Sequence, residues 1–210
     1  MFITFEGIEG CGKTTQITRL ARRLEGYRIP FIKTFEPGGT EIGKTIRQIL
    51  LDSRNVTLSP LAELSLYAAD RAQHVEEVIE PALCKGKWVL CDRFMDATVA
   101  YQGIARGLDM SLIKILNERV TKGIRPDITF LMDCPEEVGL ERALKRNRLT
   151  LKDDQDRFEK EELHFHKKVR EGYLQLARND SKRVVVMDAN LVAEVVEENI
   201  FRHIRPYIGA

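Results

Sequence analysis

The sequence predicts a three-layer α/β fold, in which a five-stranded parallel sheet is covered by helices on both faces. Short apolar, β-branched segments alternate with helix-favouring segments along the whole chain. Parallel strands need long crossover connections, which place helices on both sides of the sheet. No internal repeat, low-complexity segment or domain linker interrupts this pattern. We therefore expect residues 1–210 to form one domain, with a lid insertion at about residues 145–157.

The first strand and helix enclose a glycine-rich turn. Residues 2–5 are apolar and β-branched and predict a buried strand, and residues 7–14 match G-x-x-x-x-G-K-[ST]. An amphipathic helix follows directly, with Ile17, Leu20 and Leu24 on one face. Glycines allow the backbone amides of such a turn to converge on phosphate oxygens, and the helix N-terminus adds a partial positive charge. A chance glycine turn is the alternative, but strand and helix stand where the motif requires them.

The segment is therefore predicted to be a P-loop that binds the phosphates of ATP, within a P-loop NTPase-type fold. Lys13 is expected to reach the β- and γ-phosphates, and the Thr14 hydroxyl to hold Mg²⁺. The predicted ATP-binding residues of this segment are Gly7, Ile8, Glu9, Gly10, Cys11, Gly12, Lys13, Thr14 and Thr15.

The remaining strands and helices are predicted from apolar periodicity and from proline and glycine boundaries. Strands are expected at residues 29–35, 87–92, 127–133 and 183–187. Helices are expected from residue 40 or 41 to about 50, and at about 60–83, 95–104, 110–121, 135–144, 158–176 and 192–204. Ser59 and Pro60 suit the start of the helix at about 60–83, and Pro81 is expected to bend or end its last turn.

Composition excludes several classes of protein. Lys and Arg number 33 against 32 Asp and Glu, and a net charge of +1 argues against nucleic-acid binding through bulk electrostatics. No apolar run is long enough to cross a bilayer, and the first strand leaves no room for a signal peptide. The four cysteines lack zinc-site or CxxC spacing. We expect a cytoplasmic protein without a membrane or nucleic-acid partner.

Asp92 ends the strand expected at residues 87–92, and Arg93 follows it directly. Ligands gather at the carboxyl ends of parallel strands, so Asp92 is a candidate to bind Mg²⁺ through water or to orient a neighbouring cation. The alternative is an aspartate that caps the next helix. Arg93 is placed to hold an anionic substrate through two hydrogen bonds, or else forms a surface salt bridge.

A charged stretch lies between the fourth and fifth predicted strands. Residues 145–156 contain few apolar side chains, which is typical of exposed, mobile chain. Such stretches are usually solvated surface, but this one is expected to act as a lid whose arginines neutralise charge on the transferring phosphoryl group. The arginines in and beside it are Arg142, Arg146, Arg148 and Arg157.

The long helix at 60–83 offers a second binding surface. Tyr67, Arg71 and His74 are four and three residues apart and share one face. An aromatic plane beside a guanidinium suits stacking on a base and bonding to its carbonyl, although Tyr67 also suits core packing. The guanine-recognition and switch motifs of a signalling GTPase are absent from usable places in the sequence. These features favour a kinase with a second substrate.

Several segments together resemble the thymidylate kinase family, nucleoside monophosphate kinases that phosphorylate dTMP with ATP. The resemblance covers essentially the whole chain, and DR…S/T…AYQG is more specific than a P-loop. The segments are ITFEGIEGCGKTT, EPGGTEIGKTIRQILL, YAADRAQH, DRFMDATVAYQG, RPDITFLMD and DRFE. The resemblance implies the fold named above, ATP as phosphoryl donor, Mg²⁺, and a homodimer.

The resemblance also implies roles for individual residues. On the acceptor side, Glu9 would bind the sugar 3′-hydroxyl, Arg47 and Arg93 the phosphate, and Tyr67 the face of thymine. Arg71, Thr98 and Gln102 would contact the ring edge, Tyr101 would press near C2′, and Glu36 belongs to the same dTMP site. On the donor side, Arg142 would stack on adenine near residues 188–190. The residues expected to act in catalysis are Lys13, Arg93, Arg146, Arg148 and Arg157.

Two positions depart from the family pattern. Phe35 stands where many relatives place an arginine before EPGG, and Gly10 stands where some have a basic residue. Members without that basic residue supply arginine from the lid, which suits this chain. The expected reaction converts ATP and dTMP to ADP and dTDP. Two rivals remain open: the same architecture with another deoxynucleotide acceptor, and a non-catalytic nucleotide-binding module or ATP-driven switch.

Overall fold

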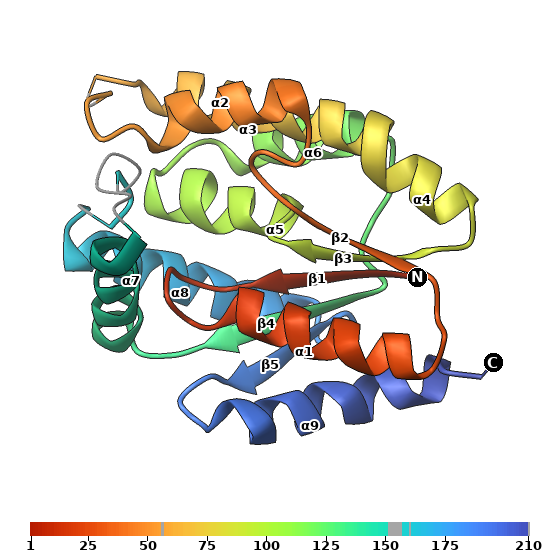
Figure 1. The fold of residues 1–210 in the computed structure, drawn as a ribbon. Helices are drawn as coiled ribbons and strands as arrows, with labels where there is room; N and C mark the ends of the chain where they lie inside the picture. The colour runs from red at the N-terminus through yellow and green to blue at the C-terminus, as the bar shows by residue number, and fades with distance from the viewer. Residues whose placement is uncertain (56, 151–156, 160, 210) are drawn as a thin grey trace.

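The computed structural model describes residues 1–55, 57–150, 157–159 and 161–209. Its five strands form one all-parallel sheet in the order β2-β3-β1-β4-β5, which confirms the predicted fold class (Figure 1). The strands are β1 (Phe2–Glu6), β2 (Phe31–Phe35), β3 (Trp88–Asp92), β4 (Ile128–Asp133) and β5 (Val184–Asp188).

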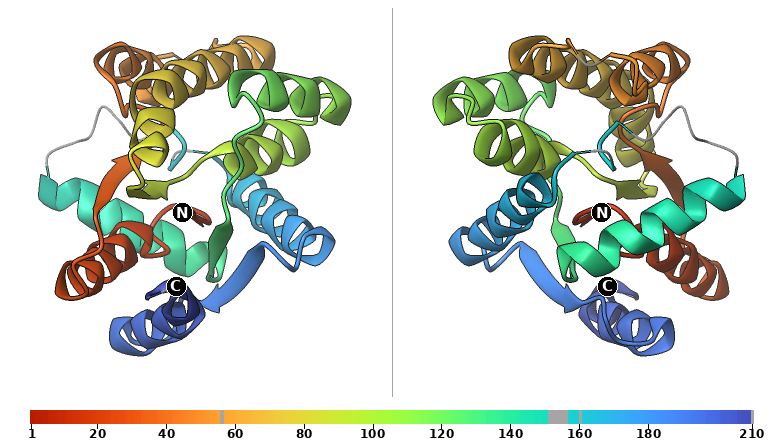
Figure 2. Two further views of the ribbon diagram at one scale, coloured as in Figure 1. Left: turned by 90° about the vertical axis from the view of Figure 1, so that its right-hand side faces the viewer. Right: turned by 90° about the vertical axis from the view of Figure 1, so that its left-hand side faces the viewer.

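Helices cover both faces of this sheet. Figure 2 shows α1 and α8 on opposite sides of it, with α9 near β5. The α-helices are α1 (Lys13–Gly26), α2 (Glu41–Leu51), α3 (Pro60–His74), α4 (Glu80–Cys84), α5 (Met95–Thr98), α6 (Met110–Val120), α7 (Glu136–Thr150), α8 (Leu163–Asn179) and α9 (Ala193–Ile204). Two π-helical segments, η1 (Val75–Ile79) and η2 (Val99–Ala105), continue α3 and α5, and a 3₁₀ turn, η3 (Arg205–Tyr207), follows α9. No helix among these described residues is long and apolar enough to span a membrane.

The central strand explains why the sequence folds this way. Every residue of β1 is buried, because β3 and β4 flank it and helices cover both faces. Apolar residues from α1, such as Leu20 and Leu24, and from α8, such as Val169 and Tyr173, join the same core. Burial on both faces is why β1 does not alternate between buried apolar and exposed polar residues. The register places the carboxyl ends of β1, β2 and β3 side by side, where the P-loop and Asp92 meet.

One predicted helix ends where expected and another extends further. The helix expected at about 60–83 is formed by α3, η1 and α4 and ends at Cys84; it continues through Pro81, because the wider π turn η1 precedes the proline and accommodates its missing N–H. Helix α7 runs to Thr150, so the prediction that 145–150 is mobile chain is wrong. Lysine, arginine and leucine in this stretch favour helix, and Ala143 and Asn147 are buried on one side of α7. Residues 151–156 of the predicted lid lie outside the described residues.

Helix α8 starts later than predicted, at Leu163 instead of 158. Phe158 lies in a turn, with its ring buried edge-on against Tyr101 at a centroid distance of 5.5 Å. Because the ring packs there, Phe158 and Glu159 line the cavity described below rather than forming a helical turn.

The loop between β2 and α2 is anchored by Asp70 of α3. The Gly38 N–H donates a hydrogen bond of 2.9 Å to Asp70 Oδ1. Asp70 is fully buried, and its Oδ2 has no hydrogen-bond partner among the described residues. Burial and the nearby Glu36 carboxylate raise the pKa of Asp70 to about 6.

We predict that Asp70→Asn removes a pH-dependent loss of stability. An unfolded aspartate has a pKa of about 3.9, so the folded chain holds a proton between about pH 4 and 6 that the unfolded chain releases. The wild-type free energy of unfolding should therefore fall as the pH rises through this window. The variant should lack this fall and be about 1–3 kcal/mol more stable at pH 7.5.

Urea unfolding at several pH values measures both effects. The exposed carboxylate of Glu171 on α8 supplies a control, and Glu171→Gln should change stability by less than about 0.5 kcal/mol. The same fall between pH 4 and 6 in Asp70→Asn as in the wild type would contradict this assignment.

Candidate nucleotide-binding site

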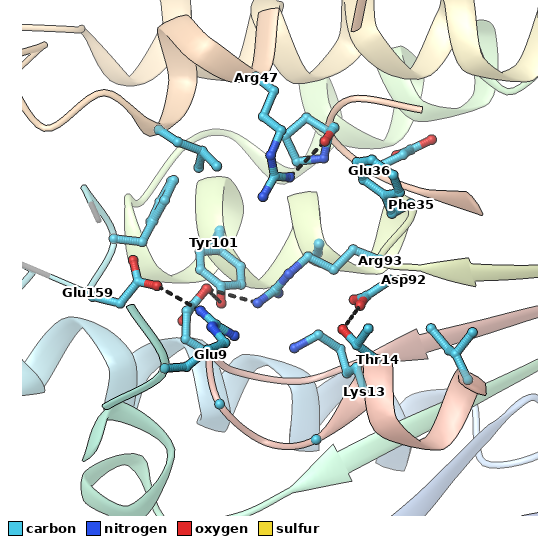
Figure 3. Close-up of a pocket in the computed structure, with 18 of the residues that line it drawn as sticks. Glu9, Lys13, Thr14, Phe35, Glu36, Arg47, Asp92, Arg93, Tyr101 and Glu159 are labelled. Carbon is cyan, nitrogen blue, oxygen red and sulfur yellow. Dashed lines mark hydrogen bonds and ion pairs between the residues drawn. The ribbon is translucent and has the colours of Figure 1, made fainter. Parts of the chain in front are cut away.

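A cavity of about 770 Å³ opens at the carboxyl edge of the sheet, between the P-loop and helices α2 and α3 (Figure 3). Its size is within the range of ligand pockets, and its position is where ligands bind in parallel α/β sheets. Most predicted site residues line it. They are Glu9, Gly10, Gly12, Lys13, Thr14, Thr15, Glu36, Arg47, Tyr67, Asp92, Arg93, Thr98, Tyr101, Gln102, Arg142 and Arg146.

Other predicted site residues do not line the cavity. Ile8 and Cys11 are buried beneath the P-loop, and Gly7 packs against the Met132 carbonyl. Arg71 and Arg157 make interactions behind the cavity wall, described below. The side chain of Arg148 lies outside the part of the chain that the structure describes.

The P-loop needs glycine at Gly10 for two reasons. Its φ of +69° is in the left-handed region, and a Cβ there would lie 2.0 Å from the carbonyl oxygen of Gly139 on α7. The backbone of Gly10 therefore lies directly against the backbone of α7. Lys13 Nζ lies over the loop and donates to the carbonyls of Gly7 (3.1 Å) and Ile8 (2.8 Å).

Thr14 and Asp92 form an oxygen pair at the base of the cavity. The Thr14 hydroxyl donates to Asp92 Oδ2 at 2.8 Å (Figure 3). Among the described residues there is no group of three or more His, Cys, Asp or Glu side chains that would enclose a metal ion. Mg²⁺ binds few protein oxygens and keeps waters and phosphate oxygens as its other ligands. One hydroxyl and one carboxylate beside a P-loop therefore fit Mg²⁺.

Glu9 joins the P-loop to the opposite wall. Its Oε1 accepts hydrogen bonds from Arg93 (2.8 Å) and from the Tyr101 hydroxyl (2.7 Å) (Figure 3). Burial acts to raise the pKa of Glu9, but the charge of Arg93 and contacts with His166 and Lys13 hold that pKa well below its usual value. Glu9 is therefore ionised, and it orients the guanidinium of Arg93.

Arg93 has a left-handed backbone, with φ of +69°, directly after β3. Such a conformation is unfavourable for a residue with a Cβ. Its guanidinium contacts Glu9, donates to the Tyr173 hydroxyl at 3.2 Å and lies 5.0 Å from the centre of the Tyr101 ring. These contacts compensate for the backbone strain and hold the cation at the cavity.

Arg47 enters the cavity from α2, opposite Lys13 (Figure 3). Its Nη1 donates to the Pro37 carbonyl at 2.8 Å, and its guanidinium lies 5.7 Å from the centre of the Phe35 ring. Burial lowers the pKa of Arg47 from its usual value, because a charged group is less well solvated there. The ring of Phe35, which stands where many relatives have an arginine, therefore packs against Arg47.

Arg71 lies behind the cavity wall. It is 1% exposed and donates to Glu36 Oε2 (2.8 Å), Thr98 Oγ1 (2.9 Å), Asn117 Oδ1 (2.9 Å) and the Phe94 carbonyl (3.0 Å). Thr98 and Glu36 line the cavity themselves, and Tyr67 lies one turn earlier on α3. Direct recognition of a ring carbonyl by Arg71 thus stays a prediction. Arg71 contacts Glu36 and Thr98, and these two residues line the cavity.

The arginines near the predicted lid have different surroundings. Arg142 lines the cavity and donates to the Ala189 carbonyl at 3.2 Å, beside the loop where adenine is expected. Arg146 lines it too and contacts Asn147 and Glu159. Arg157 instead donates to the buried Glu63 carboxylate at 2.7 Å, so it joins the lid segment to α3.

The structure adds cavity residues that sequence reasoning did not assign. Phe158 and Glu159 belong to the DRFE segment, in which only Arg157 was assigned a role. Lys33, Leu51 and Asn147 also line the cavity. Their positions depend on the folding of distant segments, so no local motif could have identified them.

Comparisons with known proteins agree with this geometry. A family model for thymidylate kinase matches residues 5–200. The thymidylate kinase of Desulfosudis oleivorans is 57% identical over 190 residues, which cover 90% of this chain and 89% of that protein. The thymidylate kinase of Geotalea uraniireducens is 51% identical over 199 residues, covering 95% and 93%.

A solved structure is also similar. The crystal structure of thymidylate kinase from Ehrlichia chaffeensis superposes with a TM-score of 0.78 at 33% identity, covering 97% of this chain and 98% of that one. Fold, cavity and sequence therefore agree, and the chain belongs to the thymidylate kinase family.

Proposed function

We propose that the cavity binds two nucleotides end to end, with ATP phosphates on the P-loop and dTMP against the wall formed by Tyr67, Arg47 and Arg93. As a thymidylate kinase, the chain converts dTMP to dTDP, a step of nucleotide biosynthesis. The observation that carries the proposal is that one cavity contains both the phosphate-binding loop and this arginine-bearing wall.

The acceptor needs no general base. A phosphate monoester has a second pKa of about 6, so its attacking oxygen is already anionic at neutral pH. The protein instead aligns two anions and offsets their repulsion. Lys13 is placed for the donor phosphates, and Arg47 and Arg93 are placed for the acceptor phosphate. Thr14 and Asp92 would hold Mg²⁺, which neutralises charge on the donor phosphates when bound.

The acceptor wall supplies recognition of the base. Tyr67 offers an aromatic face, while Thr98 and Gln102 offer polar groups from α5 and η2. Arg71 fixes Thr98 through its hydrogen bond and thereby shapes the ring-edge contacts. Glu9 Oε1 already accepts two hydrogen bonds, so binding of the sugar 3′-hydroxyl would share that oxygen with Tyr101.

The lid acts on the donor side in this proposal. Arg142 is placed to contact adenine, and Arg146 reaches the cavity from α7. Arg148 and Arg157 are the further candidates for neutralising the transferring group. We also propose a homodimer and a cytoplasmic location, because both suit a family enzyme of nucleotide biosynthesis.

An ADP-release assay with and without dTMP tests the function. We expect ADP formation to depend on dTMP. ADP formation at the same rate without a monophosphate would favour an ATP-driven switch. Parallel assays with dUMP, dCMP, dGMP and UMP test the rival acceptors, and faster turnover of any of these than of dTMP would reject the proposed acceptor.

We predict that Lys13→Ala and Tyr67→Ala separate the two halves of the site. Lys13 stabilises charge that develops on the donor, so its loss should lower kcat by about 10²–10³-fold. Base stacking contributes about 1–3 kcal/mol, so Tyr67→Ala should raise the KM for dTMP by about tenfold with a small change in kcat. Steady-state kinetics with each substrate varied measures both. Equal losses of kcat in both variants, with the KM for dTMP unchanged in Tyr67→Ala, would contradict these roles.

A second prediction concerns Phe35. Its ring supports Arg47, and an exposed cation–π contact contributes about 0.5–1 kcal/mol. Phe35→Leu should therefore raise the KM for dTMP about two- to fivefold and leave the KM for ATP unchanged. Phe35→Tyr keeps the aromatic face and serves as the control. The same KM for dTMP in Phe35→Leu and the wild type would show that the ring does not position Arg47.

A further inference from the structure

Two buried polar atoms beneath the cavity face each other without a hydrogen bond. Glu9 Oε2 and His166 Nδ1 are 3.5 Å apart, and neither has a hydrogen-bond partner among the described residues. His166 is fully buried on α8, and its ring lies edge-on to Phe165. A buried polar atom without a partner is costly, so two of them aimed at each other require an explanation.

The other nitrogen of the ring restricts the protonation state. His166 Nε2 lies 2.9 Å from the Phe158 carbonyl oxygen, which can only accept, so Nε2 must carry a proton. In a neutral ring, Nδ1 would then present its lone pair to the Glu9 carboxylate. The opposite neutral tautomer would present a lone pair to the carbonyl oxygen instead. A ring with protons on both nitrogens gives both oxygen atoms a donor.

We propose that His166 is an imidazolium in the folded enzyme and a positioning residue for the acceptor site, which it serves by fixing the Glu9 carboxylate. This inference rests on the proposed assignment of Glu9 and Arg93 to the acceptor half. With Oε2 held by His166, Oε1 is directed at Arg93 and Tyr101. Without that contact, the carboxylate is free to rotate, and both groups lose their common acceptor.

The surrounding charges are compatible with this pairing. Arg93 and Lys13 also act on Glu9 and oppose a further positive charge, whereas Glu159 adds a negative one. Glu9 is the carboxylate that faces His166 directly. Removal of one member of a buried charge pair is strongly unfavourable, so the pair is expected to be a unit.

His166 also connects the acceptor site to the end of the lid segment. Its Nε2–H holds the Phe158 carbonyl, and the Phe158 ring packs edge-on against Tyr101. One imidazolium therefore ties residues 157–159 to the carboxylate that holds Arg93 and Tyr101. A structural histidine would only fill space here, whereas this ring donates to the Phe158 carbonyl and directs Nδ1 at the Glu9 carboxylate.

NMR of the full-length enzyme labelled with ¹⁵N-histidine tests the protonation state. Histidine occurs at positions 74, 164, 166 and 203, and the His166→Asn spectrum assigns the His166 signals by their absence. At pH 7.5 we expect both His166 nitrogens to give the shifts of protonated nitrogen. A lone-pair nitrogen shift at His166 would overturn the proposal.

Two substitutions separate the two contacts. The amide of His166→Asn can place an N–H near the position of Nδ1, whereas the amide of His166→Gln can place one near Nε2. Because hydrogen bonds to charged groups are the stronger ones, His166→Gln should raise the KM for dTMP about tenfold, with the KM for ATP unchanged. His166→Asn should stay within about threefold of the wild type. His164→Gln, two residues earlier on α8 and exposed, is the matched control and should leave both KM values unchanged.

The outcomes distinguish failure of this inference from failure of the proposed function. Equal KM changes in His166→Asn and His166→Gln would reject the positioning role, because packing loss affects both alike. An unchanged KM for dTMP in Arg93→Ala would instead reject the acceptor assignment. The NMR result does not depend on that assignment, so it decides the charge of His166 in either case.

Discussion

The ion pair between Glu9 and Arg93 is the interaction on which the site depends. Glu9 belongs to the P-loop, and Arg93 follows the strand that bears Asp92. Their contact fixes the distance between the two halves of the cavity. A buried pair of this kind gains little stability over apolar packing, because both charges lose their hydration. Its value lies in orientation: the carboxylate fixes a guanidinium that neither sheet nor helix would hold in place.

This constraint explains the accumulation of polar groups beneath the cavity. The buried Glu6 accepts the Phe94 N–H and the Tyr173 hydroxyl, each at 2.7 Å, and Tyr173 in turn accepts from Arg93. Burial and the nearby Asp96 carboxylate raise the pKa of Glu6 to about 7. Each of these groups satisfies another, so the network holds Arg93 from below while the cavity approaches it from above. A buried network specifies one arrangement only when its members are satisfied in this way.

Sequence reasoning succeeded where a function depends on local spacing. The P-loop could be predicted because Gly10, Gly12 and Lys13 have fixed positions relative to one strand and one helix, and the alternation of segments predicted the parallel sheet. It failed at residues 145–150, because charged composition is shared by mobile loops and by exposed helices such as α7. The surroundings of Arg71 could not be predicted either, because Glu36, Thr98 and Asn117 come from three distant segments.

Local spacing also does not distinguish residues that line the cavity from residues that hold the lining residues in place. Helical spacing places Tyr67 and Arg71 on one face, yet Tyr67 reaches the cavity and Arg71 makes four hydrogen bonds behind it. A guanidinium is well suited to that second task, since its planar donors can bind several acceptors at once. Removing it would leave the buried Glu36 without its cation and release Thr98 from its place on the wall. The cavity wall that we propose for base recognition is therefore fixed by contacts one layer beneath its surface.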